Sequence, residues 1–600
     1  MIKKEKTIFQ TNWADRIFFV LLFLYLLLFI FQGIDFTDEG FYGVFYQQIF
    51  KNPDVVRYNF MFWFSGIIGG AFLHVFPWSG LLGLRFAAAL TTLFTMMISY
   101  HLLRKYIDPT RVKMGLLLAA VIISNDPKSL FYDNLSALFF VIMICLLFEG
   151  LRQNKPTRIF LCGVMLSVNA FTKITNITGF ALAAAILYYA IICRAPLRTI
   201  IRQILLFIGG FALTSALFLL IMKRIGHLPV FLDCLSIVKE MGKSRENSHG
   251  LLKLIRLFRY EYSHALIYSL ILLLVIVVST SLINKLKIKT EFVPIIRLVM
   301  GGCFIVFFLF MIKGLFIKWY LLLIAITGLA LIAAILIAIN PRQRSEIRLL
   351  AFLGATMTLV LPFGSDFGLY AVGRYALWVS LPLALNYYLD IQSFYPENLF
   401  GALPDNRRTA FLSFFSIRAK QLREIFKWSF AGFFLSFLYF AITNTWSDSK
   451  DRSKMIYPVN NQFMRGVFTT RIKASSINEL LAETSKYVKK DDYLLAYDEI
   501  PLVYCMTQTR PFMHNSWPRL YDRAVFSSIL TEELNQKKIL PVVIYQKVES
   551  LDNNWPSVNG DNTKEDINQP KNLCIRQFLE QYHYQLVWEN LAFRIYRPVP

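Results

Sequence analysis

The residues best placed to do chemistry form a short acidic segment, Asp35-Phe36-Thr37-Asp38-Glu39-Gly40, directly after an apolar run. These acids could cap a helix, because the free N–H groups and the dipole of its first turn stabilise carboxylates. They could also serve catalysis, because ionised groups at a lipid boundary are costly and tend to be functional. Adjacent helical residues point about 100° apart. We therefore expect one of Asp38 and Glu39 to accept a proton from a hydroxyl as a general base, and the other to hold structure or a partner.

A second acid, Asp133, lies inside the otherwise apolar run Leu130-Phe131-Tyr132-Asp133-Asn134-Leu135. A buried carboxylate needs a cation, a metal or a hydrogen-bond donor as its partner, and a packing hydrogen bond to a neighbouring helix would also serve. The candidate cations are Arg57, Lys173 and Arg374. Each of them could instead extend its charged end to lipid headgroups.

The composition indicates the kind of protein that must position these residues. Of the 600 residues, 56% are hydrophobic and 17% are charged, and the mean hydropathy is +0.48. These values exclude an ordinary soluble enzyme. The formal net charge is +24, but the basic residues occur in small groups between apolar runs. That distribution favours membrane topology signals over nucleic-acid binding, which gathers charge in one patch.

Apolar runs recur along the first three quarters of the chain. Because about 20 apolar residues cross a bilayer as a helix, we predict an α-helical polytopic membrane protein with thirteen spans, some of them short. The predicted spans are 17–34, 81–103, 114–124, 130–148, 159–172, 175–193, 204–222, 264–283, 295–312, 315–339, 349–362, 371–390 and 428–446.

The orientation follows from the basic residues between the spans, which favour the cytoplasmic side. Groups such as Arg152, Lys155 and Arg158 alternate correctly only if the apolar stretch 58–78 does not cross. We therefore place 37–80 at the outer surface, with interfacial helices at 39–50 and 60–76. The N-terminus is then cytoplasmic and, after thirteen crossings, the C-terminus is outside.

Two domains are expected, a membrane body (1–446, with an outer loop at 223–263) and an extracytoplasmic domain (447–600). The second domain alternates helical and β-rich stretches, which predicts a small α/β fold with a partly parallel sheet. Its Cys505 and Cys574 could be joined under oxidising conditions or stay free. The expected helices are 477–489 and 523–536, and the expected strands are 493–496, 541–545, 584–587 and 593–596.

Taken in order, these features resemble the polyprenyl-phosphate-sugar-dependent glycosyltransferases of the GT-C fold class, which include protein O-mannosyltransferases and lipid A aminoarabinose transferases. The resemblance covers residues 15 to 390 or so. Many relatives place a Lys before a Pro pair ahead of the aromatic run, whereas this chain has Arg57 and no such prolines. The matching residues are Asp38-Glu39-Gly40, Trp63, Arg85-Phe86-Ala87-Ala88, Asp133 and Phe171-Thr172-Lys173.

The resemblance implies an inverting transfer in which Asp38 deprotonates an acceptor hydroxyl and polyprenyl phosphate leaves. Glu39 and Asp133 would be the other acids of the site, and Arg57, Lys173 and Arg374 would bind the donor phosphate. Some relatives use a divalent metal, which the three acids could bind, although no ligand spacing calls for one. The expected partners are the lipid-linked donor and membrane lipids, and the acceptor could be a lipid, a glycan or a protein.

Three other functions would each require different features of the sequence. A lipid-linked polysaccharide polymerase or ligase would use a large outer loop rich in Arg, for which 223–263 is a modest candidate. A transporter or flippase of envelope precursors would show paired repeats and broken helices near the midplane, and the sequence has no such repeat. A non-enzymatic scaffold for envelope assembly would leave Asp38 dispensable.

Overall fold

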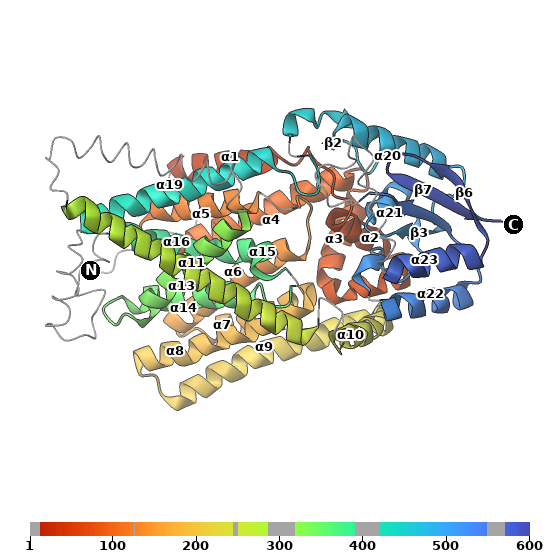
Figure 1. The fold of residues 1–600 in the computed structure, drawn as a ribbon. Helices are drawn as coiled ribbons and strands as arrows, with labels where there is room; N and C mark the ends of the chain where they lie inside the picture. The colour runs from red at the N-terminus through yellow and green to blue at the C-terminus, as the bar shows by residue number, and fades with distance from the viewer. Residues whose placement is uncertain are drawn as a thin grey trace.

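The computed structural model of the protein describes residues 13–124, 127–243, 250–285, 319–365, 367–390, 419–449, 451–521, 523–548 and 570–599. Most of these residues are helical. A bundle of long helices occupies one end of the molecule and a sheet with its own helices occupies the other, with α2 and α3 between them (Figure 1). Helices α2 and α3 therefore lie at the boundary between the bundle and the sheet domain.

The bundle consists of long apolar helices, in which every interior backbone group bonds within its own segment, as a bilayer requires. Seven helices among the described residues are long and apolar enough to cross a membrane. The bundle elements are α1 (Trp13–Leu27), α4 (Gly80–Leu103), α5 (Pro109–Ile123), α6 (Tyr132–Arg152), α7 (Pro156–Thr172), η2 (Ile174–Ala183), α8 (Ala184–Cys193), α9 (Leu197–Arg224), α11 (Leu251–Lys285), α13 (Trp319–Ile339), α14 (Ser345–Val360), α15 (Gly368–Ala371), η4 (Gly373–Ala376), α16 (Leu377–Leu389) and α19 (Ala419–Thr443).

Twelve of the thirteen predicted spans coincide with helical segments of the bundle, which confirms a polytopic helical body. The span expected at 295–312 lies outside the described residues. Several of the twelve are too short to meet the length criterion that the seven candidates meet. The count of thirteen crossings therefore stays a prediction.

The first predicted span ends early, because tertiary contacts replace its helical hydrogen bonds. Helix α1 ends at Leu27 although the apolar sequence continues to Ile34. Beyond it, Phe468 N donates to Phe31 O (2.8 Å) and Gly33 N donates to Phe468 O (2.9 Å). Gly33 has a φ of +88°, a conformation that favours glycine. The chain thus leaves the bundle toward the sheet domain just before the acidic segment.

The segment predicted to lie at the outer surface forms three short helices, α2 (Asp38–Gln48), η1 (Pro53–Phe62) and α3 (Trp63–Val75). The two helices expected there are present as α2 and α3, and their place at a membrane interface stays a prediction. Helix α10 (Leu228–Lys243), from the predicted outer loop, lies against η1: Cys234 Sγ donates to Tyr58 O at 3.3 Å. These helices lie at the end of the bundle that meets the sheet domain (Figure 1).

The C-terminal segment forms a five-stranded mixed sheet in the order β4-β3-β5-β7-β6. Strand β3 runs parallel to β4 and β5, whereas β7 is antiparallel to β5 and β6, so the predicted partly parallel sheet is confirmed. Two-residue strands such as β4 escape a pattern analysis. The elements are η6 (Arg452–Lys454), β1 (Tyr457–Pro458), β2 (Phe468–Thr469), α20 (Arg471–Thr484), β3 (Tyr493–Tyr497), α21 (Leu502–Thr507), β4 (Arg510–Pro511), η7 (Pro518–Leu520), α22 (Arg523–Lys537), β5 (Val542–Gln546), α23 (Pro570–Gln581), β6 (Tyr584–Glu589) and β7 (Phe593–Pro598).

The sheet domain docks on α2 through a close backbone contact. Leu502 N, at the start of α21, donates to Phe36 O at 3.0 Å. A Cβ on Gly40 would lie only 2.1 Å from that same nitrogen. Both Cys505 and Cys574 are free thiols in the structure, and buried Cys505 packs against α2, with its Sγ 3.6 Å from Gly40 O.

Candidate active site

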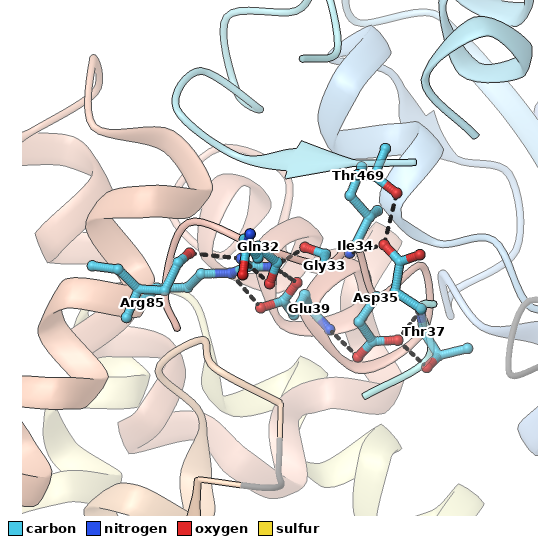
Figure 2. A network of polar contacts seen from close by, with 10 residues as sticks. Gln32, Gly33, Ile34, Asp35, Thr37, Glu39, Arg85 and Thr469 are labelled. Atoms are coloured by element: carbon cyan, nitrogen blue, oxygen red, sulfur yellow. Dashed lines mark hydrogen bonds and ion pairs between the residues drawn. The ribbon is translucent and has the colours of Figure 1, made fainter. Parts of the chain in front are cut away.

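The first turn of α2 is capped by Asp35 rather than by the acids inside the turn. Asp35 Oδ1 accepts from Thr37 N (3.0 Å) and Thr37 Oγ1 (2.6 Å), and its Oδ2 accepts from Glu39 N (3.3 Å) (Figure 2). Burial raises the pKa of Asp35 to about 6 and the nearby Glu39 charge adds to the rise, although the three hydrogen bonds oppose it. Asp35, which precedes the turn, therefore caps it.

Glu39 is held in a buried ion pair with Arg85 of α4, and both side chains are at most 2% exposed. Arg85 donates to both carboxylate oxygens of Glu39, from Nε at 2.8 Å and from Nη2 at 2.6 Å. It also donates to Ile30 O and Gly33 O, each at 2.7 Å (Figure 2). Such bidentate pairs are strong and directional. Of the two adjacent acids, Glu39 is therefore the one that holds structure.

Asp38 and Asp133 lie near the same buried tyrosine, Tyr42, although they come from α2 and α6. The pKa of Tyr42 is raised well above its usual value, first by burial and then by Tyr132 and the carboxylates of Asp38 and Asp133. Asp38 is partly buried and Asp133 is buried. The structure therefore brings together the two acids that the sequence placed 95 positions apart.

Aromatic rings surround these acids. The Tyr42 ring stacks on Phe131 at a centroid distance of 5.6 Å and meets Tyr132 edge to face at 5.4 Å. Tyr132 in turn stacks on Phe62 of η1 at 4.4 Å. These contacts join α2, η1 and the start of α6 into one packed unit. They exclude water from around the carboxylates, which strengthens electrostatic interactions there.

One of the three predicted cations pairs with Asp133, and the charge of a second acts on it. Lys173, at the end of α7, places Nζ 3.4 Å from Asp133 Oδ1 and 4.5 Å from the centroid of the Tyr132 ring. Arg374, in η4, is fully buried and donates to Ala371 O (2.8 Å) and Tyr370 O (3.0 Å). Its charge also acts on Asp133. The positive charge expected at this site is thus supplied from two elements.

The third predicted cation, Arg57, belongs to a different group of side chains. Its guanidinium lies 3.6 Å from Asp233 of α10 and 3.9 Å from Asp54. Its charge acts on Tyr521 and Lys537 of the sheet domain. Arg57 therefore lies where η1 meets the sheet domain, near Asp54 and Asp233, and its role as a donor-phosphate ligand stays a prediction.

Sequence reasoning missed the residues that fix the loop before α2. Asp448 Oδ2 accepts from Ile34 N (2.8 Å) and from Thr469 Oγ1 (2.7 Å), as Figure 2 shows for Ile34 and Thr469. Lys473 Nζ lies 3.0 Å from Asp448 Oδ1, and both side chains are buried. No spacing links residue 34 to residue 448. The only available sequence signal is an Asp directly after the last apolar run.

A metal does not fit the predicted acids well. No group of three or more His, Cys, Asp or Glu side chains that could hold a metal ion occurs among the residues that the structure describes. Both oxygens of Glu39 are bound by Arg85. The cavity beside this pair has a volume of about 10 Å³, room for about one water molecule. We therefore derive no step through a metal.

Solved structures that are similar to this chain include an ArnT and an oligosaccharyltransferase. No protein-family model matches the chain, and no curated protein matches it. The crystal structure of ArnT from Cupriavidus metallidurans bound to undecaprenyl phosphate is 11% identical, with a TM-score of 0.47 and 98% of each chain covered. The oligosaccharyltransferase of Archaeoglobus fulgidus, in complex with Zn and sulfate, is 12% identical, with a TM-score of 0.41 and 88% of this chain and 68% of that chain covered. Identities and TM-scores this low carry no information about the function of this chain.

Proposed function

We propose that the protein is a membrane glycosyltransferase that moves a sugar from a polyprenyl-phosphate carrier to a hydroxyl acceptor at the outer face of the membrane, with inversion. The observation that carries the proposal is that Asp38 and Asp133 both act on buried Tyr42, while Lys173 pairs with Asp133 and the charge of Arg374 acts on it. A base and two buried cations in one apolar setting suit a reaction that activates a hydroxyl and releases a phosphate.

Asp38 is the general base in this proposal. The acceptor O–H gives its proton to the Asp38 carboxylate while the oxygen forms a bond to the anomeric carbon. The bond between that carbon and the phosphate oxygen breaks, and its electron pair stays on the leaving phosphate. Glu39 is unsuited to the task because Arg85 binds both of its oxygens. Asp38 lies within the capped turn, between the two residues whose backbone N–H groups bind Asp35, so its backbone is held in place.

Lys173 and Arg374 would neutralise the charge that develops on the leaving phosphate. A lysine ammonium has three N–H donors, so Lys173 can bind Asp133 and still donate to a phosphate oxygen. Asp133 then acts by positioning Lys173. Both cations are buried in a bundle of lipid-spanning length. This setting suits a phosphate whose hydrocarbon tail lies in the bilayer, because electrostatic stabilisation is larger where water is excluded.

The proposal is tested with Asp38→Asn. Membranes that contain the full chain are incubated with radiolabelled undecaprenyl-phosphate-linked sugars, one at a time, and label is measured in the lipid, glycan and protein fractions. Because the amide keeps the shape of the carboxylate and loses its basicity, we expect the transfer rate to fall at least about 100-fold with unchanged protein level.

The matched control is Asp451→Asn, which makes the same chemical change at an exposed carboxylate that caps a short turn. Asn is an equally good cap, so this variant should transfer at the wild-type rate. Near wild-type transfer by Asp38→Asn would reject Asp38 as the base. Absence of transfer by the wild type from every sugar tested would reject the glycosyltransferase proposal.

A further inference from the structure

A group of polar side chains, most of them buried and several incompletely hydrogen-bonded, lies where η1 meets the sheet domain. We call it the outer polar cluster and define it as Arg57, Asn515, Ser516, Trp517 and Tyr521. Arg57 Nε, Ser516 Oγ and Trp517 Nε1 have no hydrogen-bond partner among the described residues, and the side chains of Asn515 and Tyr521 contact each other. Asn515, Ser516 and Tyr521 are at most 1% exposed. Buried polar groups are normally paired, so such a concentration needs an explanation.

The members of the cluster are close in space as well as in sequence. Tyr58 N of η1 donates to His514 O at 3.2 Å, and the Tyr58 ring meets the Tyr521 ring edge to face at 5.6 Å. A side-chain hydrogen bond from Asn515 and the charge of Arg57 both act on the Tyr521 hydroxyl. The rings of Tyr58 and Trp517 both contact Phe41, so residues of η1 and of the sheet domain meet at this point.

Arg57 retains hydrogen-bonding capacity at this point. Its contacts to Asp233 and Asp54, at 3.6 Å and 3.9 Å, are too long to be hydrogen bonds. Its side chain is 20% exposed, and Trp517 is also partly exposed. The cluster thus reaches the surface through Arg57 and Trp517, while its other members lie deeper.

The cluster also adjoins the candidate active site. The Trp517 ring contacts Phe41 of α2 edge to face at a centroid distance of 5.9 Å. Phe41 is followed by Tyr42, the residue on which Asp38 and Asp133 act. Phe41 lies about one helical turn from Asp38 in α2, so a molecule bound at the cluster would lie on the side of α2 that leads to the candidate base.

The chemistry of the cluster indicates the class of ligand. It combines an amide donor, two hydroxyls, an indole N–H and a guanidinium with the ring faces of Tyr58, Trp517 and Tyr521. Sugars present hydroxyl groups alternating with C–H faces, which match such a mixture of polar atoms and rings. A hydrocarbon chain would leave Arg57 Nε, Ser516 Oγ and Trp517 Nε1 unpaired, at a cost.

We propose that the outer polar cluster is a carbohydrate-binding subsite that holds the glycan part of the acceptor while Asp38 activates the hydroxyl at its end. The inference rests on the proposed function for the meaning of "acceptor", but the binding itself needs no donor and no transfer. The sheet domain then takes part in the same site through residues 515–521. Arg57 binds the acceptor in this proposal, not the donor phosphate.

The test uses Ser516→Ala and Tyr521→Phe, each of which removes one buried hydroxyl of the cluster. The Ser516 hydroxyl has no partner among the described residues, so its removal costs no hydrogen bond and Ser516→Ala should keep the wild-type Tm. If the cluster is a subsite, each variant should bind oligosaccharide about three- to tenfold more weakly. The detergent-solubilised full chain is applied to an array of defined neutral, amino and acidic oligosaccharides, and affinity is then measured for those that bind.

Thr484→Val is the matched control, because Thr484 Oγ1 is another buried, unpaired hydroxyl in the sheet domain, on α20. It should bind like the wild type. The proposal is overturned if the wild type binds no oligosaccharide, or if all three variants bind equally well. Binding of phospholipid vesicles or of unglycosylated Ser/Thr peptides that is lost in Ser516→Ala and Tyr521→Phe would also overturn it in favour of another acceptor class.

Asp38→Asn separates this inference from the proposed reaction. The variant should bind oligosaccharide with wild-type affinity, because Asp38 is not part of the cluster. Full transfer by Asp38→Asn would reject the base and leave the binding result intact. If Ser516→Ala and Tyr521→Phe bound oligosaccharide as tightly as the wild type while Asp38→Asn still lost transfer, only the subsite would be rejected.

Discussion

Three acids within five residues have three different surroundings. Asp35 accepts hydrogen bonds from the start of α2, Asp38 lies near Tyr42, and Glu39 pairs with Arg85. The angle between successive helical residues requires Asp38 and Glu39 to point in different directions, and the structure shows where each points. The residue types alone indicate an acidic site. Only the geometry distinguishes the cap, the candidate base and the structural ion pair.

Asp35 gives a pH-dependent prediction. Its pKa in the folded protein, about 6, lies above the ordinary value of 3.8, so the folded state holds this proton more tightly than the unfolded state. The stability that it contributes is fully present below about pH 4 and is lost as the pH rises through about 6. We expect the wild type to lose roughly 2–3 kcal/mol relative to Asp35→Asn between pH 4 and pH 7, measured by denaturation in detergent with tryptophan fluorescence.

Asp451→Asn serves as the control. Hydrogen bonds from Ser453 lower the pKa of Asp451, so the stability that Asp451 contributes is fully present above about pH 4, and the difference in stability between the wild type and this variant should stay constant from pH 4 to pH 7. If the wild type became more stable relative to Asp35→Asn over that range, the pKa of Asp35 would have to be lowered rather than raised.

At this scale the sequence predicts the kinds of residue but not their pairing. Asp133 needs a cation because it interrupts an apolar run, and Lys173 was one of three candidates. The structure pairs the two. Nothing in the spacing distinguishes Lys173 from Arg57, because their separation in space depends on how α7 and η1 pack. The Glu39–Arg85 pair was missed for the same reason.

At the scale of elements, α2 is positioned by a contact that only glycine permits. Gly40 lies two residues after Asp38, and its helix touches the backbone at the start of α21. We predict that Gly40→Ala forces the two helices apart, since the added Cβ would meet Leu502 N at 2.1 Å and Leu502 Cα at 2.6 Å. Overpacking of this kind costs about 1–3 kcal/mol. We expect a lower Tm and slower transfer, because Asp38 moves with α2.

Gly209→Ala provides the comparison. Gly209 lies inside α9, and a Cβ there would meet nothing within 4 Å. Since alanine favours the helix by about 1 kcal/mol relative to glycine, this variant should be as stable as the wild type or more so, with unchanged transfer. Equal Tm values for the two alanine variants would show that α2 and α21 do not approach each other as closely as the structure has them.

Hydropathy predicts helices better than it predicts where they end. The apolar run after Ile17 suggests a span to Ile34, yet α1 ends at Leu27 because residues 31–33 bond to Phe468. The central strands of the sheet follow from short apolar, β-rich runs, as at β3 and β5. Their partners do not, because strand order depends on contacts between distant segments.

At the scale of the whole molecule, the sheet domain fixes the loop that leads into the candidate active site. Asp448 and Lys473 form a buried ion pair, and Asp448 also binds Ile34 N, one residue before Asp35. This contact could not be read from the sequence, since 414 positions separate its two sides. Transfer should accordingly depend on residues that are remote from the acids and cations of the site.

The last prediction is a double-mutant cycle on this ion pair, with Asp448→Asn, Lys473→Met and the double variant. Each single change leaves one buried charge without its partner, which typically costs about 3–5 kcal/mol. The double variant should cost less than the sum, because it leaves no unpaired charge. Lys486→Met, at the largely exposed pair with Glu483, should cost at most about 1 kcal/mol.

The same variants test the loop directly. The rate of hydrogen exchange at residues 33–41 should rise in Asp448→Asn and stay unchanged in Lys486→Met, and the transfer rate should fall in Asp448→Asn. If the costs of the two single changes simply added, or if exchange at 33–41 stayed at the wild-type rate, the sheet domain would not be what holds the loop in place.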